Sequence, residues 1–215
     1  VVLRLGEPPG DVFAPIEERP VVSQDIPRPV PLLDAYHLAA SWASEWREDA
    51  GLILVSMQVE YPADEPIATP SAAAASGGYY LFTFAGPQED GAWPRLTLAV
   101  GRQSGVIYHE GVMSSTVEPP PAIDTLLVGL PISAEQAFGI ADRVVGVAYR
   151  VGCEDTRRQA QVVLDTTNRE SPAWVVIYYD SRERNVNDIV VRIDAETGQT
   201  RTDTRDEASC NPPRG

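Results

Sequence analysis

One order of elements, a helix followed by several short strands, is predicted twice in this 215-residue chain. When Gly105 is placed on Gly198, Leu96, Leu98 and Val100 fall on Ile189, Val191 and Ile193. A shift two residues longer places Tyr79 to Phe82 near Trp174 to Ile177. Recurrence of one pattern at a nearly fixed spacing is typical of internal duplication. The sequence therefore predicts two copies of one small α+β unit.

The first copy begins with a predicted helix for which Asp34 is a plausible N-cap and which ends near Gly51. Its apolar stripe consists of Ala35, Leu38, Ala39, Trp42, Ala43 and Trp46. Alternating apolar residues predict strands at 52–61 and 79–85, then a third at Leu96 to Val100 and a short fourth at 106–108. Residues 62–78, rich in Pro, Ala and Gly, predict a mobile loop.

The second copy begins with a capping box, Ser133 to Gln136. Its helical stripe consists of Ala137, Phe138, Ala141, Val144, Val145 and Ala148. Strands are predicted at 159–165, 173–180, 189–193 and 199–202. The last hairpin of each copy contains a glycine, Gly105 or Gly198. A turn of this length places one residue at positive φ, where glycine has no Cβ penalty.

The second copy resembles a PepSY domain in its helix start, Ile132 to Ala137, its central strand, Trp174 to Tyr179, and its closing hairpin, Val191 to Gly198. The first copy is similar in element order and in its turn at Gly105. The resemblance implies a cystatin-like fold and an extracytoplasmic bacterial module. Such modules occur in protease propeptides, where an inhibitory role is proposed, and in exported or membrane-anchored proteins. The family has no catalytic residues to transfer.

We therefore expect a Pro-rich N-terminal arm (1–31), a PepSY-like unit (32–116), a Pro-rich linker (117–131), a second unit (132–203) and a C-terminal tail (204–215). Each unit is expected to pack one helix on an antiparallel sheet of three or four strands. The chain begins at Val1 without a methionine. That start is consistent with the stub of a missing N-terminal membrane anchor, with an ordinary first strand or with a cut end.

The net charge of −14, from 17 basic and 31 acidic residues, disfavours phosphate backbones as a partner, so no nucleic acid is expected. The two cysteines, Cys153 and Cys210, fit no zinc or redox motif. They predict either one structural disulfide in an oxidising compartment or two unpaired thiols.

Candidate chemistry is sparse. His37 lies within the first predicted helix and His109 beside Glu110, and neither accompanies a nucleophile motif. Asn185, Asn187 and Asp188 favour a polar hairpin loop over a Ca²⁺ site. Core packing is favoured over a ligand cage for the aromatic set Tyr79, Tyr80, Phe82, Trp174, Tyr178 and Tyr179. We expect no catalytic, cofactor or metal site.

The strand Trp174 to Tyr179 is apolar on both faces, so its second face needs cover from the other unit, the arm or a partner. The prediction is a non-enzymatic interaction protein, periplasmic or at the cell surface, that docks on a larger membrane or cell-surface complex through a protein partner. The alternative is a protease-inhibitor or propeptide-like module. An enzyme of this α+β shape is the third and least favoured hypothesis.

Overall fold

The computed structural model describes residues 29–60, 77–150, 159–179 and 189–204 of the chain. Its first half contains α1 (Leu32–Trp46), β1 (Gly51–Glu60), β2 (Gly77–Ala85), β3 (Trp93–Gly101) and β4 (Ile107–Ser115). Its second half contains α3 (Asp124–Gly129), α4 (Ala134–Ala141), the π-turn η1 (Asp142–Gly146), α5 (Val147–Arg150), β5 (Gln159–Asp165), β6 (Ala173–Tyr179), β7 (Ile189–Asp194) and β8 (Thr200–Thr204). The predicted α+β class with antiparallel strands is confirmed.

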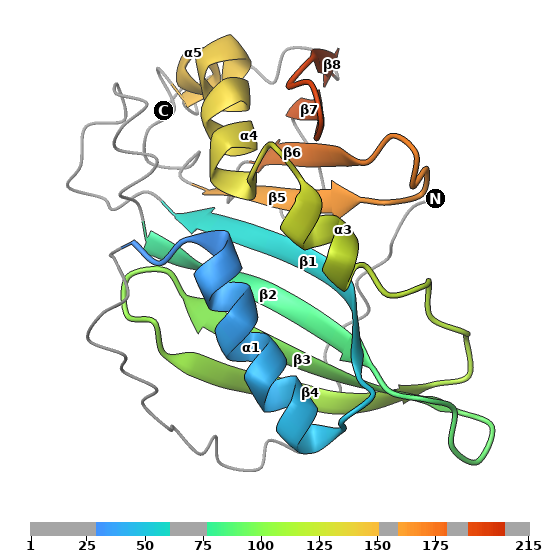
Figure 1. Cartoon of the computed structure of the whole chain (residues 1–215). Coiled ribbons are helices and arrows are strands. Elements are labelled where there is room, and N and C mark those ends of the chain that lie inside the picture. Colours follow the sequence, from blue (N-terminus) through green and yellow to red (C-terminus); the bar gives the residue numbers. More distant parts are fainter. Residues whose placement is uncertain (1–28, 61–76, 151–158, 180–188, 205–215) are drawn as a thin grey trace, which may run out of the picture.

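The strands form one sheet of eight, in the order β4-β3-β2-β1-β5-β6-β7-β8, rather than a separate sheet in each unit. The halves join through β1 and β5, which pair antiparallel from Ser56 with Val163 to Glu60 with Gln159. Each half therefore covers the open edge of the other half's first strand, because an exposed edge leaves backbone donors and acceptors unpaired. The helices lie on one face of this sheet (Figure 1).

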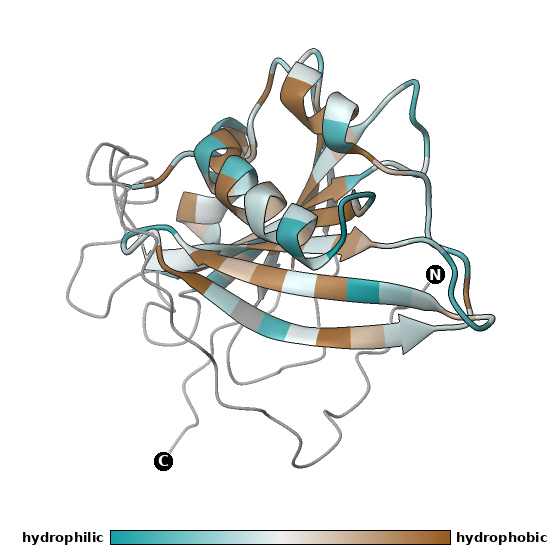
Figure 2. Cartoon of the chain, turned by 60° about the horizontal axis from the view of Figure 1, so that its bottom comes forward, coloured by the Kyte–Doolittle hydropathy of each residue, from teal (hydrophilic) through white to brown (hydrophobic). Residues whose placement is uncertain are grey.

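Strand alternation sorts the side chains between the helix-covered face and the opposite face, here called the open face. Apolar and polar residues alternate along the strands nearest the viewer in Figure 2. In β6, Trp174, Val176 and Tyr178 are fully buried on the helix-covered face. Val175 and Ile177, on the open face, are only half-buried. The chain therefore buries the helix-covered face of β6 completely and its open face only in part.

The two closing hairpins share their backbone hydrogen bonds. In the first, the N–H of Gly105 donates to Gly101 and the N–H of Gly101 to Val106; in the second, the N–H of Gly198 donates to Asp194 and the N–H of Asp194 to Gln199. Gly105 has φ 66° and Gly198 φ 73°. The predicted positive φ of both glycines is confirmed.

The approach to each helix is also held in the same way. The Val30 N–H donates to the carbonyl of Arg102, as the Ile132 N–H donates to that of Ala195. A buried aromatic residue then donates to the carbonyl two residues before each helix. Tyr80 Oη donates to Val30 at 3.0 Å and Trp174 Nε1 to Ile132 at 2.7 Å. These contacts match Tyr80 with Trp174.

That match corrects the alignment of the two central strands by one residue. The sequence placed Tyr79 on Trp174, whereas Tyr80 is paired with Val100 as Trp174 is paired with Ile193. A slip of one residue exchanges the two faces of a strand. The apolar pattern could not reveal this slip of one residue, because both strands are apolar on both faces.

The helix α1 begins at Leu32, two residues before the predicted N-cap Asp34. Pro31 occupies the cap position without a side-chain bond. Instead, the Leu32 N–H donates to Oε1 of Glu135 at 2.7 Å, and Tyr80 Oη lies 2.6 Å from the same oxygen. A carboxylate of the second half thus accepts a hydrogen bond from a free backbone N–H at the start of α1, in the first half. By contrast, the predicted capping box Ser133–Gln136 is confirmed.

The predicted linker 117–131 contains the short helix α3, which ties the halves together. Asp124 in its first turn accepts a bond from Tyr36 Oη at 2.7 Å and one from the Leu52 N–H at 2.9 Å. These bonds connect α3 to α1 and β1. A helix of six residues is too short to show the sustained periodicity by which a helix is recognised in sequence.

The predicted stripe of the second helix ends at η1. A π-turn adds a residue to one turn and so rotates the next turn of the helix relative to the stripe. Val144, expected in the buried stripe, is 51% exposed. Gly146 allows the turn to approach the sheet, since a Cβ there would lie 2.5 Å from the hydroxyl of Tyr178.

Two strands extend beyond their predicted limits. The strand β4 continues to Ser115 instead of ending at Tyr108. The strand β2 begins at Gly77, within the predicted loop 62–78. Gly78 has φ 111°, and a Cβ there would lie 2.1 Å from the Gln58 carbonyl oxygen. Glycine is therefore required at position 78 because β1 approaches the backbone closely there, and not because the residue lies in a loop.

Candidate functional site

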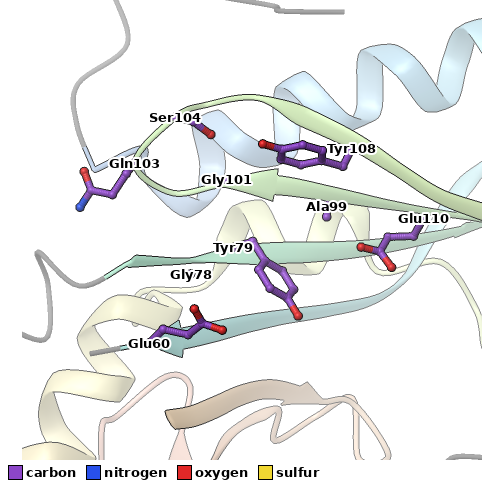
Figure 3. Close-up of a pocket in the computed structure, with 9 residues that line it drawn as sticks. All are labelled: Glu60, Gly78, Tyr79, Ala99, Gly101, Gln103, Ser104, Tyr108 and Glu110. Carbon is purple, nitrogen blue, oxygen red and sulfur yellow. The ribbon is translucent and has the colours of Figure 1, made fainter. Parts of the chain in front are cut away.

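A hollow of about 350 Å³ lies on the open face at the β3–β4 end of the sheet. Figure 3 shows two tyrosines, Tyr79 and Tyr108, on separate strands with Ala99 and Gly101 between them, and the carboxylates of Glu60 and Glu110 flanking Tyr79. The full lining consists of Glu60, Gly78, Tyr79, Ala99, Gly101, Gln103, Ser104, Tyr108 and Glu110.

The register of three strands creates the hollow. Tyr79 of β2 is paired with Gly101 of β3, and Ala99 of β3 is paired with Tyr108 of β4. Directly paired residues point to the same face of a sheet. The small residues of β3 therefore form the floor, and the two larger side chains form the walls.

A β-bulge brings Glu110 to this hollow. In the β3–β4 ladder, Leu98 is paired with His109 and Thr97 with Gly111, so Glu110 is left out of the pairing. Gly111 has φ 149°. Bulges at sheet edges redirect a side chain, and the Glu110 side chain here lines the hollow and is exposed.

The electrostatics of the hollow are negative. Burial raises the pKa of the Tyr79 hydroxyl above its ordinary value, and the charges of Glu110 and Glu60 raise it further. Ionisation of Tyr79 would add a third negative charge beside two carboxylates. The phenol is thus held in its neutral form, a hydrogen-bond donor with an aromatic face between two anions.

Two exposed apolar side chains lie farther along β4, the strand that contributes Tyr108 and Glu110 to the hollow. Within the part of the chain that the structure describes, β4 is an edge strand whose neighbour is β3. Its residues Val112 and Met113 are 50% and 68% exposed. We call the hollow together with Val112 and Met113 the β4 surface. It combines an aromatic and acidic recess with an apolar edge.

The predicted aromatic set is divided by strand alternation. Tyr80, Phe82, Trp174 and Tyr178 belong to the core, which confirms the favoured interpretation for these four. Tyr79 instead lines the hollow. The strand β6 includes Tyr179, whose side chain lies outside the described set.

Other predicted residues do not meet at this site. His37 is exposed on α1, with its ring 5.4 Å from that of Tyr36. His109 lies in β4, and its side chain is outside the described set. Cys153, Cys210, Asn185, Asn187 and Asp188 lie outside the described residues, as does the arm up to residue 28. The disulfide therefore stays a prediction.

The described residues contain no group of three or more His, Cys, Asp or Glu placed to hold a metal ion. Within the same ranges, no helix combines the length and apolar composition that a bilayer crossing requires.

Comparison of the chain with protein-family models, with curated proteins and with solved structures finds no match. The chemistry of the site therefore rests on its own residues.

Sequence reasoning missed Glu60, Ala99, Tyr108 and Glu110 as parts of one site. These residues come from three strands, so only the pairing of the strands brings them together. One local signal existed. Glu110-Gly111 interrupts an otherwise apolar stretch, and a glycine inside a strand indicates a bulge or a close approach.

Proposed function

We propose that the chain is a non-enzymatic interaction protein that docks on a larger membrane or cell-surface complex through a protein partner. The observation that carries this proposal is the β4 surface, which combines the exposed Val112 and Met113 of β4 with a hollow walled by Tyr79 and Tyr108. Exposed apolar side chains near tyrosines are typical of protein-binding patches, in which aromatic residues and methionine are enriched.

We further propose that the halves are two copies of one PepSY-like, cystatin-like unit joined at β1 and β5. The repeated hydrogen bonds support this. The Arg102 N–H donates to Gly78 as the Ala195 N–H donates to Pro172, in addition to the matched helix approaches and hairpins. The buried helix faces also match, since Ala35, Tyr36 and Ala39 on α1 correspond to Ala137, Phe138 and Ala141 on α4.

The proposed location is outside the cytoplasm, periplasmic or at the cell surface. The resemblance to PepSY modules and the pair Cys153 and Cys210 support it. Intact mass of freshly isolated protein, with and without reductant, tests the compartment. We expect oxidised cysteines, and free thiols would contradict the location and the disulfide together.

The binding proposal is tested by site-specific photo-crosslinking in the cells that make the protein. A photoreactive residue at Met113 should capture a protein, whereas one at the comparably exposed Val144, on the helix side of the second half, should not. Capture of a subunit of a membrane or surface complex supports the proposal. Capture of a secreted protease would support the inhibitor alternative instead, and no capture from Met113 would contradict both.

A further inference from the structure

We propose that the β4 surface takes an extended, basic segment of a partner protein, with one lysine or arginine side chain seated in the hollow between Tyr79 and Tyr108. This inference rests on the proposed function and names the chemistry of the partner. It commits to a segment that lies along β4, the edge strand of the described sheet.

Charge complementarity selects a cation for the hollow. Glu60 and Glu110 flank Tyr79, and among the described residues no lysine or arginine lines the hollow. Aromatic faces attract ammonium and guanidinium groups, and carboxylates add charge-assisted hydrogen bonds. An anionic ligand would meet two carboxylates and a net charge of −14.

The edge of β4 selects an extended segment. A peptide that adds a strand to a sheet edge gains main-chain hydrogen bonds, and its alternate side chains reach opposite faces. Met113 is paired with Arg95 and so lies on the open face, whereas Val112 is paired with Leu96 on the other. A segment along the whole of β4, Ile107–Ser115, would cover both and pass Tyr108 and Glu110, from where one long side chain could enter the hollow.

A second copy of the chain is a poor occupant. The strand β4, Ile107–Ser115, contains no lysine or arginine, so its pairing with itself would supply no cation to either hollow. Two chains of charge −14 would also repel each other. A basic segment of a different protein therefore fits the hollow better than a second copy of this chain.

The second half shows how the hollow can be closed. By register, Arg192 of β7 stands where Ala99 stands in β3, since each is paired with the corresponding residue of the neighbouring strand, Val175 or Leu81. Ala99→Arg should therefore place a cation of the chain itself in the hollow and exclude the ligand's cation.

The experiment titrates the full chain with fluorescent peptides of threonine and valine that carry one central lysine, with methionine or glutamate at that position as controls. At low ionic strength the lysine peptide should bind about tenfold more tightly than the methionine peptide, and added salt should remove the difference. Slowed amide exchange in β4, with none in β8, should accompany binding.

Variants of the chain test whether the lysine side chain of the peptide binds in the hollow. Glu110→Gln and Glu60→Gln should each weaken the lysine peptide by about threefold to tenfold. Ala99→Arg should weaken it by about tenfold or more. Ser41→Arg, on the exposed side of α1, adds the same charge elsewhere and should change affinity by less than about twofold. Glu110→Gln removes only an exposed charge, so it keeps the inference testable if Ala99→Arg fails to fold.

Equal binding of the lysine and methionine peptides, or equal effects of Ala99→Arg and Ser41→Arg, would overturn the inference. So would β4 protection that requires a second copy of the chain. If peptides fail but crosslinking from Met113 persists, the basic-segment inference is wrong and the protein-binding proposal stands. If crosslinking also fails, both are wrong.

Discussion

The open face differs between the two ends of the sheet, although the backbone there is built alike. At the β3–β4 end, Ala99 is paired with Tyr108, and the space above β3 is open. At the β7–β8 end, the corresponding pair is Arg192 and Arg201. Arg192 reaches Oδ2 of Asp165 with its Nη2 at 2.6 Å.

The difference shows that open-face side chains can change without changing the hairpin beside them. Both ends share the hairpin hydrogen bonds and the first ladder pairs after the turn, whereas the bulge that brings Glu110 to the hollow occurs in β4 and has no counterpart in the β7–β8 ladder. The open-face residues of β3 and β7 do not enter these bonds through their side chains. A change from a small to a long residue there closes a hollow and leaves the fold in place.

The largest contrast is expected where backbone crowding differs between the halves. Gly78→Ala should lower the free energy of unfolding by about 3 kcal/mol or more, because the new Cβ meets the Gln58 carbonyl at positive φ. The corresponding Pro172→Ala should cost about 1 kcal/mol. Urea unfolding measures both, and equal losses would show that the two strand starts are not distinguished by this contact.

A smaller effect is expected from the ion pair of the second half. Burial alone would raise the pKa of Asp165, but hydrogen bonds from Thr167 and Arg192 outweigh it and hold the pKa below its ordinary value. Arg192→Ala should raise that pKa and reduce stability at pH 7 by less than about 1 kcal/mol, since both partners are partly exposed.

The direction of the Asp165 pKa shift sets the pH range in which the ion pair stabilises the fold. A lowered carboxyl pKa stabilises the fold above the unfolded value of about 3.9 and the contribution is lost as pH falls through the folded pKa. The difference between the parent and Arg192→Ala should therefore be complete at neutral pH and shrink below about pH 4. Denaturation measured across this range tests it, and a difference unchanged at low pH would contradict an electrostatic origin.

The smallest effect concerns the hollow itself. Glu110→Gln should lower the pKa of Tyr79 toward its ordinary value, because one of the two charges that raise it is removed. Ring-carbon NMR of labelled tyrosines, assigned with Tyr79→Phe, measures this shift. An unchanged titration of Tyr79 would place the Glu110 carboxylate away from the hollow.

Elements with a strong local pattern could be predicted from the sequence, and those defined by contact could not. The alternation in β1 and β5 and the capping box at Ser133 depend on neighbouring residues alone. The start of α1 depends on Glu135, which lies 103 residues away. Similarly, Tyr79 and Tyr80 are adjacent and chemically identical, and only strand pairing assigns one to the hollow and the other to the core.

By itself, the sequence determined the α+β class, the antiparallel strands and the glycines at the two closing turns, because helix period, strand alternation and positive φ are local properties. The tertiary structure decided that β1 and β5 join eight strands into one sheet, and that Glu60, Tyr79, Tyr108 and Glu110 border one hollow. The physical reason is that strand edges pair through backbone groups that every residue carries, so the choice of neighbour leaves little trace in the side chains.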